Sequence, residues 1–165
     1  MQLRTKVRGR KGIIMMIQEL ADFSIVVRES SLKRFRKVPL GMENWQYQKG
    51  KMSFADLAFH LVECDQWMLD MIGGNRLLPI TESRLQTNSR GEFEAMLETL
   101  YTSGERRKSF IQQCSSDTLD RRIYDPRVDK EVTVWWFIVR GNLDHEIHHR
   151  GQVAILLNLC SPPAP

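Results

Sequence analysis

The chain has 165 residues, of which 42% are hydrophobic and 27% are charged, so a wholly disordered protein is excluded and one globular domain is expected. The formal net charge is +4, but residues 1–11 carry five basic and no acidic side chains, so the remaining 154 residues carry −1. The basic character therefore belongs to a tail, and it does not indicate a domain that binds nucleic acid.

Apolar residues that recur at helical spacing predict four long helices, of which the first covers about residues 13–37. The second is expected to start after Ser53, because Asp56 three residues later completes a pattern like a capping box. Its apolar stripe ends at Gly73 and Gly74, and glycine is a common residue where a helix stops.

The third predicted helix begins near Ser89, and the fourth covers about residues 133–159. The helices are separated by three connections that are longer than a minimal bundle needs, at roughly 38–52, 75–88 and 115–132. The short Val128–Val134 segment has the composition of a strand, but the rest of the chain offers it no evident partner. We therefore predict an all-α fold, a four-helix bundle with long connections.

The predicted organisation has three parts. Residues 1–12 form a basic tail that we expect to be disordered, residues 13–160 form the single bundle domain, and residues 161–165 form a C-terminal tail. The three cysteines contain no CxxC pair and indicate no disulfide framework. The apolar run near the N-terminus is too short for a signal peptide, and no run approaches the roughly 18 residues that span a membrane. We therefore expect a cytoplasmic protein without a membrane or nucleic-acid partner.

Three of the four histidines fall within five residues of the fourth predicted helix, and this clustering is the strongest functional signal in the sequence. His145 and His149 are four residues apart, so they lie on one helix face and can point at the same metal ion. His60 lies among apolar residues of the second helix, so the two helices can place these three imidazoles around one divalent ion. His148 lies about 100° around the helix from His149, where it flanks the site or faces solvent. The alternative is a polar patch without a metal.

Neighbouring residues leave further alternatives open. The segment from His145 to His149 reads HExxH, the zinc-protease pattern with Glu146 as general base, but no third histidine follows and no sheet is evident. Cys64, one turn after His60, is either a fourth ligand that would close the site or a small buried residue. Glu63 is the candidate catalytic acid, and the alternative for it is a solvated surface carboxylate.

The chemistry that such a site allows follows from its ligands. Three neutral imidazoles leave a divalent ion with its full charge and an open position, where it lowers the pKa of bound water and deprotonates a bound thiol. A metal-bound thiolate or hydroxide would then attack a small electrophile. Gln152, three residues after His149, can orient a ligand imidazole by a hydrogen bond. Gly141, one turn before His145, leaves space either for a coordination position or for close helix packing.

Two segments resemble motifs of the DinB-like (DinB/YfiT) superfamily. Ser53–Glu63 (SFADLAFHLVE), with Trp67 following, is similar to the second-helix motif, and Asp144–Val153 (DHEIHHRGQV) is similar to the last-helix motif. The resemblance extends over roughly residues 13–159. It implies a four-helix bundle in which three histidines hold one divalent metal ion, at His60, His145 and His149. Cys64 departs from the family pattern, because a small apolar residue is expected at that position.

The resemblance also implies a range of metals and activities. Zinc or nickel is expected first, and iron and manganese also occur among such proteins. Some relatives are thiol-dependent S-transferases or isomerases that use a low-molecular-weight thiol as cosubstrate, and many are homodimers. The expected function is therefore that of a metal-dependent thiol S-transferase or hydrolase with a small-molecule substrate. The alternative is a non-catalytic metal-binding or stress-induced interaction protein.

Overall fold

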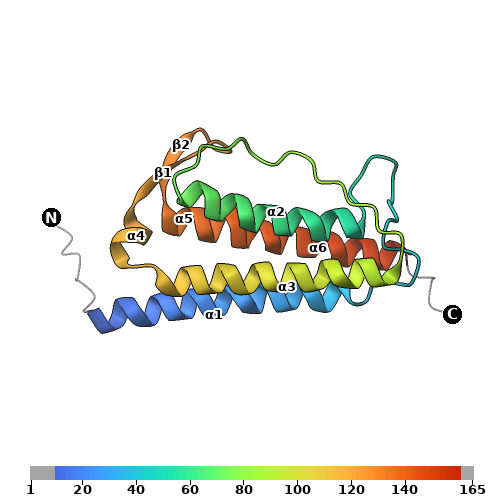
Figure 1. Ribbon diagram of the computed structural model, residues 1–165, viewed down its shortest axis with the longest axis horizontal. Helices are drawn as coiled ribbons and strands as arrows, with labels where there is room; N and C mark the ends of the chain where they lie inside the picture. Colours follow the sequence, from blue (N-terminus) through green and yellow to red (C-terminus); the bar gives the residue numbers. More distant parts are fainter. Residues whose placement is uncertain (1–9, 161–165) are drawn as a thin grey trace.

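The computed structural model describes residues 10–160, so the segments 1–9 and 161–165 of the two predicted tails lie outside the described residues. Its long helices run side by side as a bundle, with α1 packed along α3 and α2 lying against α6 (Figure 1). The elements in chain order are α1 (Arg10–Phe35), α2 (Phe54–Ile72), α3 (Arg90–Gln113), α4 (Ser116–Asp120), β1 (Arg122–Asp125), β2 (Lys130–Thr133), α5 (Val134–Ile138), η1 (Val139–Leu143) and α6 (Asp144–Cys160). Helix α1 begins three residues before the predicted domain boundary. Within the described chain, no helix is long and apolar enough to cross a membrane.

Side-chain caps fix where α2, α3 and the short helix α5 begin. The Ser53 hydroxyl accepts the backbone N–H of Asp56, whose carboxylate accepts the backbone N–H of Ser53, so the predicted capping box is present. Ser89 accepts the backbone N–H of Glu92 at the start of α3, and Thr133 caps α5 in the same way. Each cap satisfies a backbone donor that has no partner within the helix.

The fourth predicted helix is divided into three segments. Between α5 and α6 the chain forms the π-helical segment η1, in which Gly141, Asn142 and Leu143 are all buried. Such π-helical turns are often found at functional sites.

The expectation that Val128–Val134 lacks a strand partner is wrong. The β2 strand in this segment pairs antiparallel with β1, and Arg122 lies opposite Thr133. Each of the two strands buries a single side chain, Asp125 in β1 and Val132 in β2. The apolar alternation by which strands are recognised is therefore missing from the sequence.

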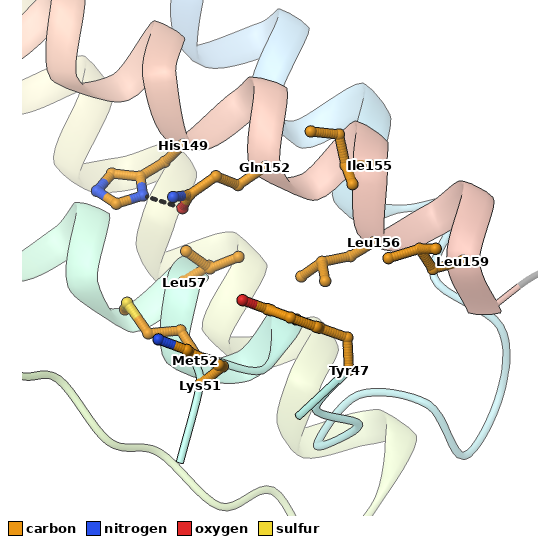
Figure 2. A pocket seen from close by; sticks show the side chains of 9 residues that line it. All are labelled: Tyr47, Lys51, Met52, Leu57, His149, Gln152, Ile155, Leu156 and Leu159. Atoms are coloured by element: carbon orange, nitrogen blue, oxygen red, sulfur yellow. Dashed lines mark hydrogen bonds between the residues drawn. The ribbon is translucent and has the colours of Figure 1, made fainter. Parts of the chain in front are cut away.

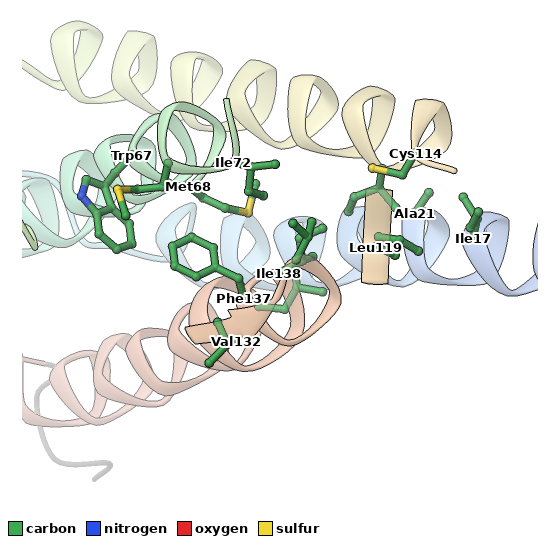
Figure 3. Packing of buried hydrophobic residues seen from close by; sticks show 14 residues of the cluster. Ile17, Ala21, Trp67, Met68, Ile72, Cys114, Leu119, Val132, Phe137 and Ile138 are labelled. Atoms are coloured by element: carbon green, nitrogen blue, oxygen red, sulfur yellow. The ribbon is translucent and has the colours of Figure 1, made fainter. Parts of the chain in front are cut away.

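The core consists of two apolar clusters with a polar layer between them. Near the hairpin, Trp67 stacks on Phe137 with ring centroids 5.3 Å apart (Figure 3). The other cluster is built around Phe54 and Phe93. Between the clusters lie four charged side chains that are almost completely buried, here called the buried charge cluster: Arg28, Asp65, Arg107 and Glu146.

Candidate metal centre

Helices α2 and α6 bring the predicted ligands to the same level of the bundle. His60 lies on α2, while His145 and His149 lie one turn apart on α6. The Nε2 atoms of His60 and His145 are 3.3 Å apart, and those of His145 and His149 are 2.5 Å apart. The structure therefore places the three histidines together, with their Nε2 atoms directed to one region.

The spacing of His60, His145 and the nearby Cys64 suits a metal ion. The ligand atoms of His60, Cys64 and His145 all lie within 4.8 Å of one another. Metal–ligand bonds of about 2.0–2.1 Å to nitrogen and about 2.3 Å to sulfur separate tetrahedral ligands by about 3.3 Å (N···N) and 3.5 Å (N···S). The corresponding separations here are 3.3 Å between the two imidazoles and 3.5 Å between Cys64 Sγ and His60 Nε2. These residues could hold a divalent metal ion.

His149 needs a small movement to join the same ion. Its Nε2 lies 2.5 Å from that of His145, so the two rings must separate by about 0.8 Å before both can be ligands. The geometry therefore offers two ligand sets that share His60 and His145. One set is completed by Cys64 and the other by His149.

Hydrogen bonds on the far side of two rings determine which nitrogen faces the centre. His60 Nδ1 lies 2.9 Å from the Ser83 hydroxyl, which donates its hydrogen bond to the Glu63 carboxylate, so Ser83 accepts a hydrogen bond from His60. His149 Nδ1 lies 2.7 Å from Gln152 Oε1, which can only accept (Figure 2). Both contacts assign the ring proton to Nδ1 and leave the Nε2 lone pair free, as in metal sites with oriented histidine ligands.

The residues that the sequence placed beside the candidate ligands differ in how closely they contact them. Glu63 contacts it only through Ser83, a residue that sequence analysis missed because it lies 23 positions from His60 in an irregular connection. Gln152 makes the predicted contact with a ligand imidazole. His148 is exposed and its Nε2 lies 3.1 Å from the Gln152 amide nitrogen, so it flanks the centre.

Burial keeps the imidazoles neutral. Burial and the charges of His149 and His60 lower the pKa of His145 to about 3, and burial lowers the pKa of His149 to about 4. Burial also lowers the pKa of His60. At neutral pH all three rings are therefore in the form that binds metals. Burial, followed by the charge of Asp65, raises the pKa of Cys64 to about 12, so the metal-free protein holds it as a thiol.

Comparison with known proteins identifies the family of the chain. Residues 26–153 match the family model of the DinB superfamily. The chain belongs to the DinB superfamily. A crystal structure of a DinB-like protein from Bacillus subtilis is similar with a TM-score of 0.64 and 17% identity, over 89% of this chain and 96% of that chain. No match was found among curated proteins. The resemblance and the all-α fold predicted from the sequence are thus confirmed.

In this DinB chain, Glu146 cannot act as the general base of an HExxH protease. Its carboxylate accepts hydrogen bonds of 2.8 Å from both Arg28 Nε and Arg107 Nη1, and its side chain is 1% exposed. Burial alone would raise the pKa of Glu146, but the charges of Arg107 and Arg28 outweigh it and hold the pKa at about 2. The carboxylate is therefore a paired, structural group.

The buried charge cluster joins all four long helices of the DinB bundle. Asp65 on α2 accepts hydrogen bonds of 2.8 Å from Arg28 on α1 and from Arg107 on α3. Asn142 in η1 accepts from Arg107 and donates to the backbone carbonyl of Cys64. The cluster thus fixes both segments that carry candidate ligands. Sequence analysis missed it because isolated charged residues on helices usually face solvent.

Another arginine, Arg127, occupies the space beside Gly141. The guanidinium of Arg127 lies 4.7 Å from the ring centroids of both Trp67 and Phe137. A Cβ atom on Gly141 would come within 2.2 Å of Arg127 Nη2, so only glycine permits this approach. Arg127 and His145 both line a cavity of about 100 Å³, enough for a few water molecules at about 30 Å³ each.

A larger cavity, here called the apolar pocket, opens on the His149 side of the DinB site (Figure 2). Its volume is about 540 Å³. It is lined by Tyr47, Lys51, Met52, Leu57, His149, Gln152, Ile155, Leu156 and Leu159. The candidate ligand His149 therefore separates the metal centre from a space that is large enough for a small organic molecule.

Proposed function

We propose that this DinB protein is a metal-dependent enzyme that holds one divalent ion through His60, His145 and His149. The observation that carries the proposal is the pair of Nδ1 hydrogen bonds behind His60 and His149, which direct two Nε2 lone pairs to the same region. An ion bound there would act as a Lewis acid and lower the pKa of a water or thiol that binds to it. Zinc and nickel suit this nitrogen set best, with iron and manganese as alternatives.

The proposed reaction is attack of an intact low-molecular-weight thiol on a small electrophile, in which a new C–S bond forms, the S–H proton is released and the leaving group of the electrophile departs; when water is the nucleophile, the reaction is hydrolysis. The residues of the chain prepare the site for this reaction. Burial keeps the imidazoles neutral, and the Ser83–Glu63 pair compensates the positive charge that His60 gains as a ligand. The cavities beside His145 and His149 give small molecules access.

A non-catalytic metal site is the second candidate, and one distance favours it. Cys64 Sγ lies 3.5 Å from His60 Nε2, the separation expected of two ligands on one ion. Four ligands would close the site, and closed sites are structural. The two candidates therefore differ in the role of Cys64.

Conjugation of glutathione with 1-chloro-2,4-dinitrobenzene tests the proposed activity, because the thiol sulfur displaces chloride and releases a proton. The zinc- or nickel-loaded full chain should catalyse this reaction, lose activity with EDTA, and regain it when metal is restored. His149→Ala should abolish turnover and Cys64→Ser should retain it. Loss of the bound metal in Cys64→Ser, with no turnover in the wild type, would instead support the closed site.

A further inference from the structure

The apolar pocket has the size and walls of a site for a small organic molecule. Its volume of about 540 Å³ lies within the range of about 300–1,000 Å³ that such sites occupy. Leu57 and Leu156 form its buried floor, while Ile155 and Leu159, one turn apart on α6, are still 60% and 58% exposed. A ligand with an apolar body would remove these side chains from water.

Two polar groups at the same pocket have no partner in the described part of the chain. Lys51 lines the pocket, and its ammonium group forms no ion pair within residues 10–160. The hydroxyl of Tyr47 is directed into the pocket (Figure 2), and among the described residues it has no hydrogen-bond partner. Neither Asp nor Glu lines the pocket. One positive charge beside one hydroxyl donor suits a single carboxylate better than a doubly charged phosphate.

The remaining lining residues connect this pocket with the metal centre. His149 and Gln152 form part of its wall, so a molecule in the pocket touches a proposed ligand of the ion. A polar low-molecular-weight thiol does not match walls made of leucine, isoleucine and methionine side chains. We infer, on the basis of the proposed function, that the apolar pocket binds the electrophilic substrate. That substrate has an aliphatic or aromatic body and one carboxylate, held by Lys51 and Tyr47.

Octanoate is a suitable probe, because it combines an aliphatic body with one carboxylate. Calorimetric titration of the full chain should show one octanoate site, both without metal and after loading with zinc. Octylamine, which has the same body and the opposite charge, should bind more weakly. Lys51→Gln should weaken octanoate binding about fivefold, whereas Lys49→Gln, in the same connection but outside the pocket, should leave it unchanged.

The apolar contact is tested in the same titration. Ile155→Asp should weaken octanoate binding about tenfold, and Val26→Asp, an equally exposed position on α1, should have no effect. Equal effects of Lys51→Gln and Lys49→Gln, or octylamine binding as tightly as octanoate, would overturn the inference. Zinc binding is measured separately, so zinc bound without octanoate refutes the pocket alone. Octanoate bound by a chain that takes up no zinc refutes the metal site alone.

Discussion

At His60, the hydrogen bond behind the ring decides which nitrogen can bind a metal ion. Ser83 accepts a hydrogen bond from Nδ1 and donates one to the Glu63 carboxylate, so the ring is held with Nε2 facing the centre. Residues that orient a histidine ligand in this way contribute strongly to metal affinity although they never touch the ion.

Replacement of Ser83 tests this orientation. Ser83→Ala should lower the affinity for zinc by about 10- to 100-fold, because His60 loses the partner that fixes its tautomer. Thr81→Ala, in the same connection and exposed, is the matched control and should bind zinc as the wild type does. Affinity is measured by competition with a chelator, and equal affinities of the two variants would contradict this role of Ser83.

The low histidine pKa values predict how the stability of the metal-free protein depends on pH. Between pH 6.5 and about 4 the unfolded chain takes up protons that His145 and His149 do not take up in the folded state. The free energy of unfolding should therefore fall as the pH is lowered through this range. The contribution of each histidine is at most about 1.4 kcal/mol per pH unit, and solvent screening reduces it at the half-buried His145 ring.

Urea unfolding at pH 7.5 and pH 5.0 measures this dependence. His145→Asn should show a smaller loss of stability on acidification than the wild type, whereas the exposed His148→Asn should behave as the wild type does. Glu146, with its pKa held at about 2 by the two arginines, contributes its own loss only below about pH 4.5. A slope unchanged in His145→Asn would show that this ring is not kept neutral by the fold.

At the scale of single helices and strands, sequence rules predict those features that contacts between residues close together in the chain determine. The start of α2 was predictable because Ser53 and Asp56 satisfy each other's backbone within one turn. The segment η1 was not, because its geometry depends on Asn142 bonding across the bundle and on Arg127 packing against Gly141. The hairpin was missed for a related reason, since its strands carry almost no apolar alternation.

In the candidate site too, residues placed by helical spacing were predictable, and a residue placed by an irregular connection was not. His145 and His149 were predictable from their spacing of four residues, and His60 from its apolar surroundings on α2. Ser83 was not predictable, because only the path of the connection along α2 brings it to His60 (Figure 1). Function-bearing contacts made by irregular segments leave no periodic signal in a single sequence.

Across the whole molecule, the buried charge cluster couples the four helices at the level of the metal centre. Burial alone would lower the pKa of Arg28, but the charges of Asp65 and Glu146 outweigh it and raise the pKa. The arginines are therefore charged, and each depends on the acidic residues around it. The homodimer implied by the family resemblance stays a prediction at this scale.

Removing one member of this cluster should destabilise the whole fold. Arg107→Met leaves Asp65 and Glu146 with a single arginine between them, and should lower the free energy of unfolding by about 3–5 kcal/mol. Arg36→Met is the matched control, because Arg36 is exposed and lies 4.0 Å from Glu98, so its loss should cost less than about 1 kcal/mol. Urea unfolding of both variants checks the difference, and similar losses would contradict the structural role of the cluster.

Metal content of the full chain, prepared without a histidine tag and exposed to zinc or nickel, tests the central claim most directly. Elemental analysis should find about one divalent ion per wild-type chain and per His148→Ala chain, because the exposed His148 is not a proposed ligand. His60→Ala, His145→Ala and His149→Ala should each retain little metal. A wild-type chain that takes up neither zinc nor nickel, or a loss in His148→Ala as large as in the other variants, would contradict a metal centre built on these three histidines.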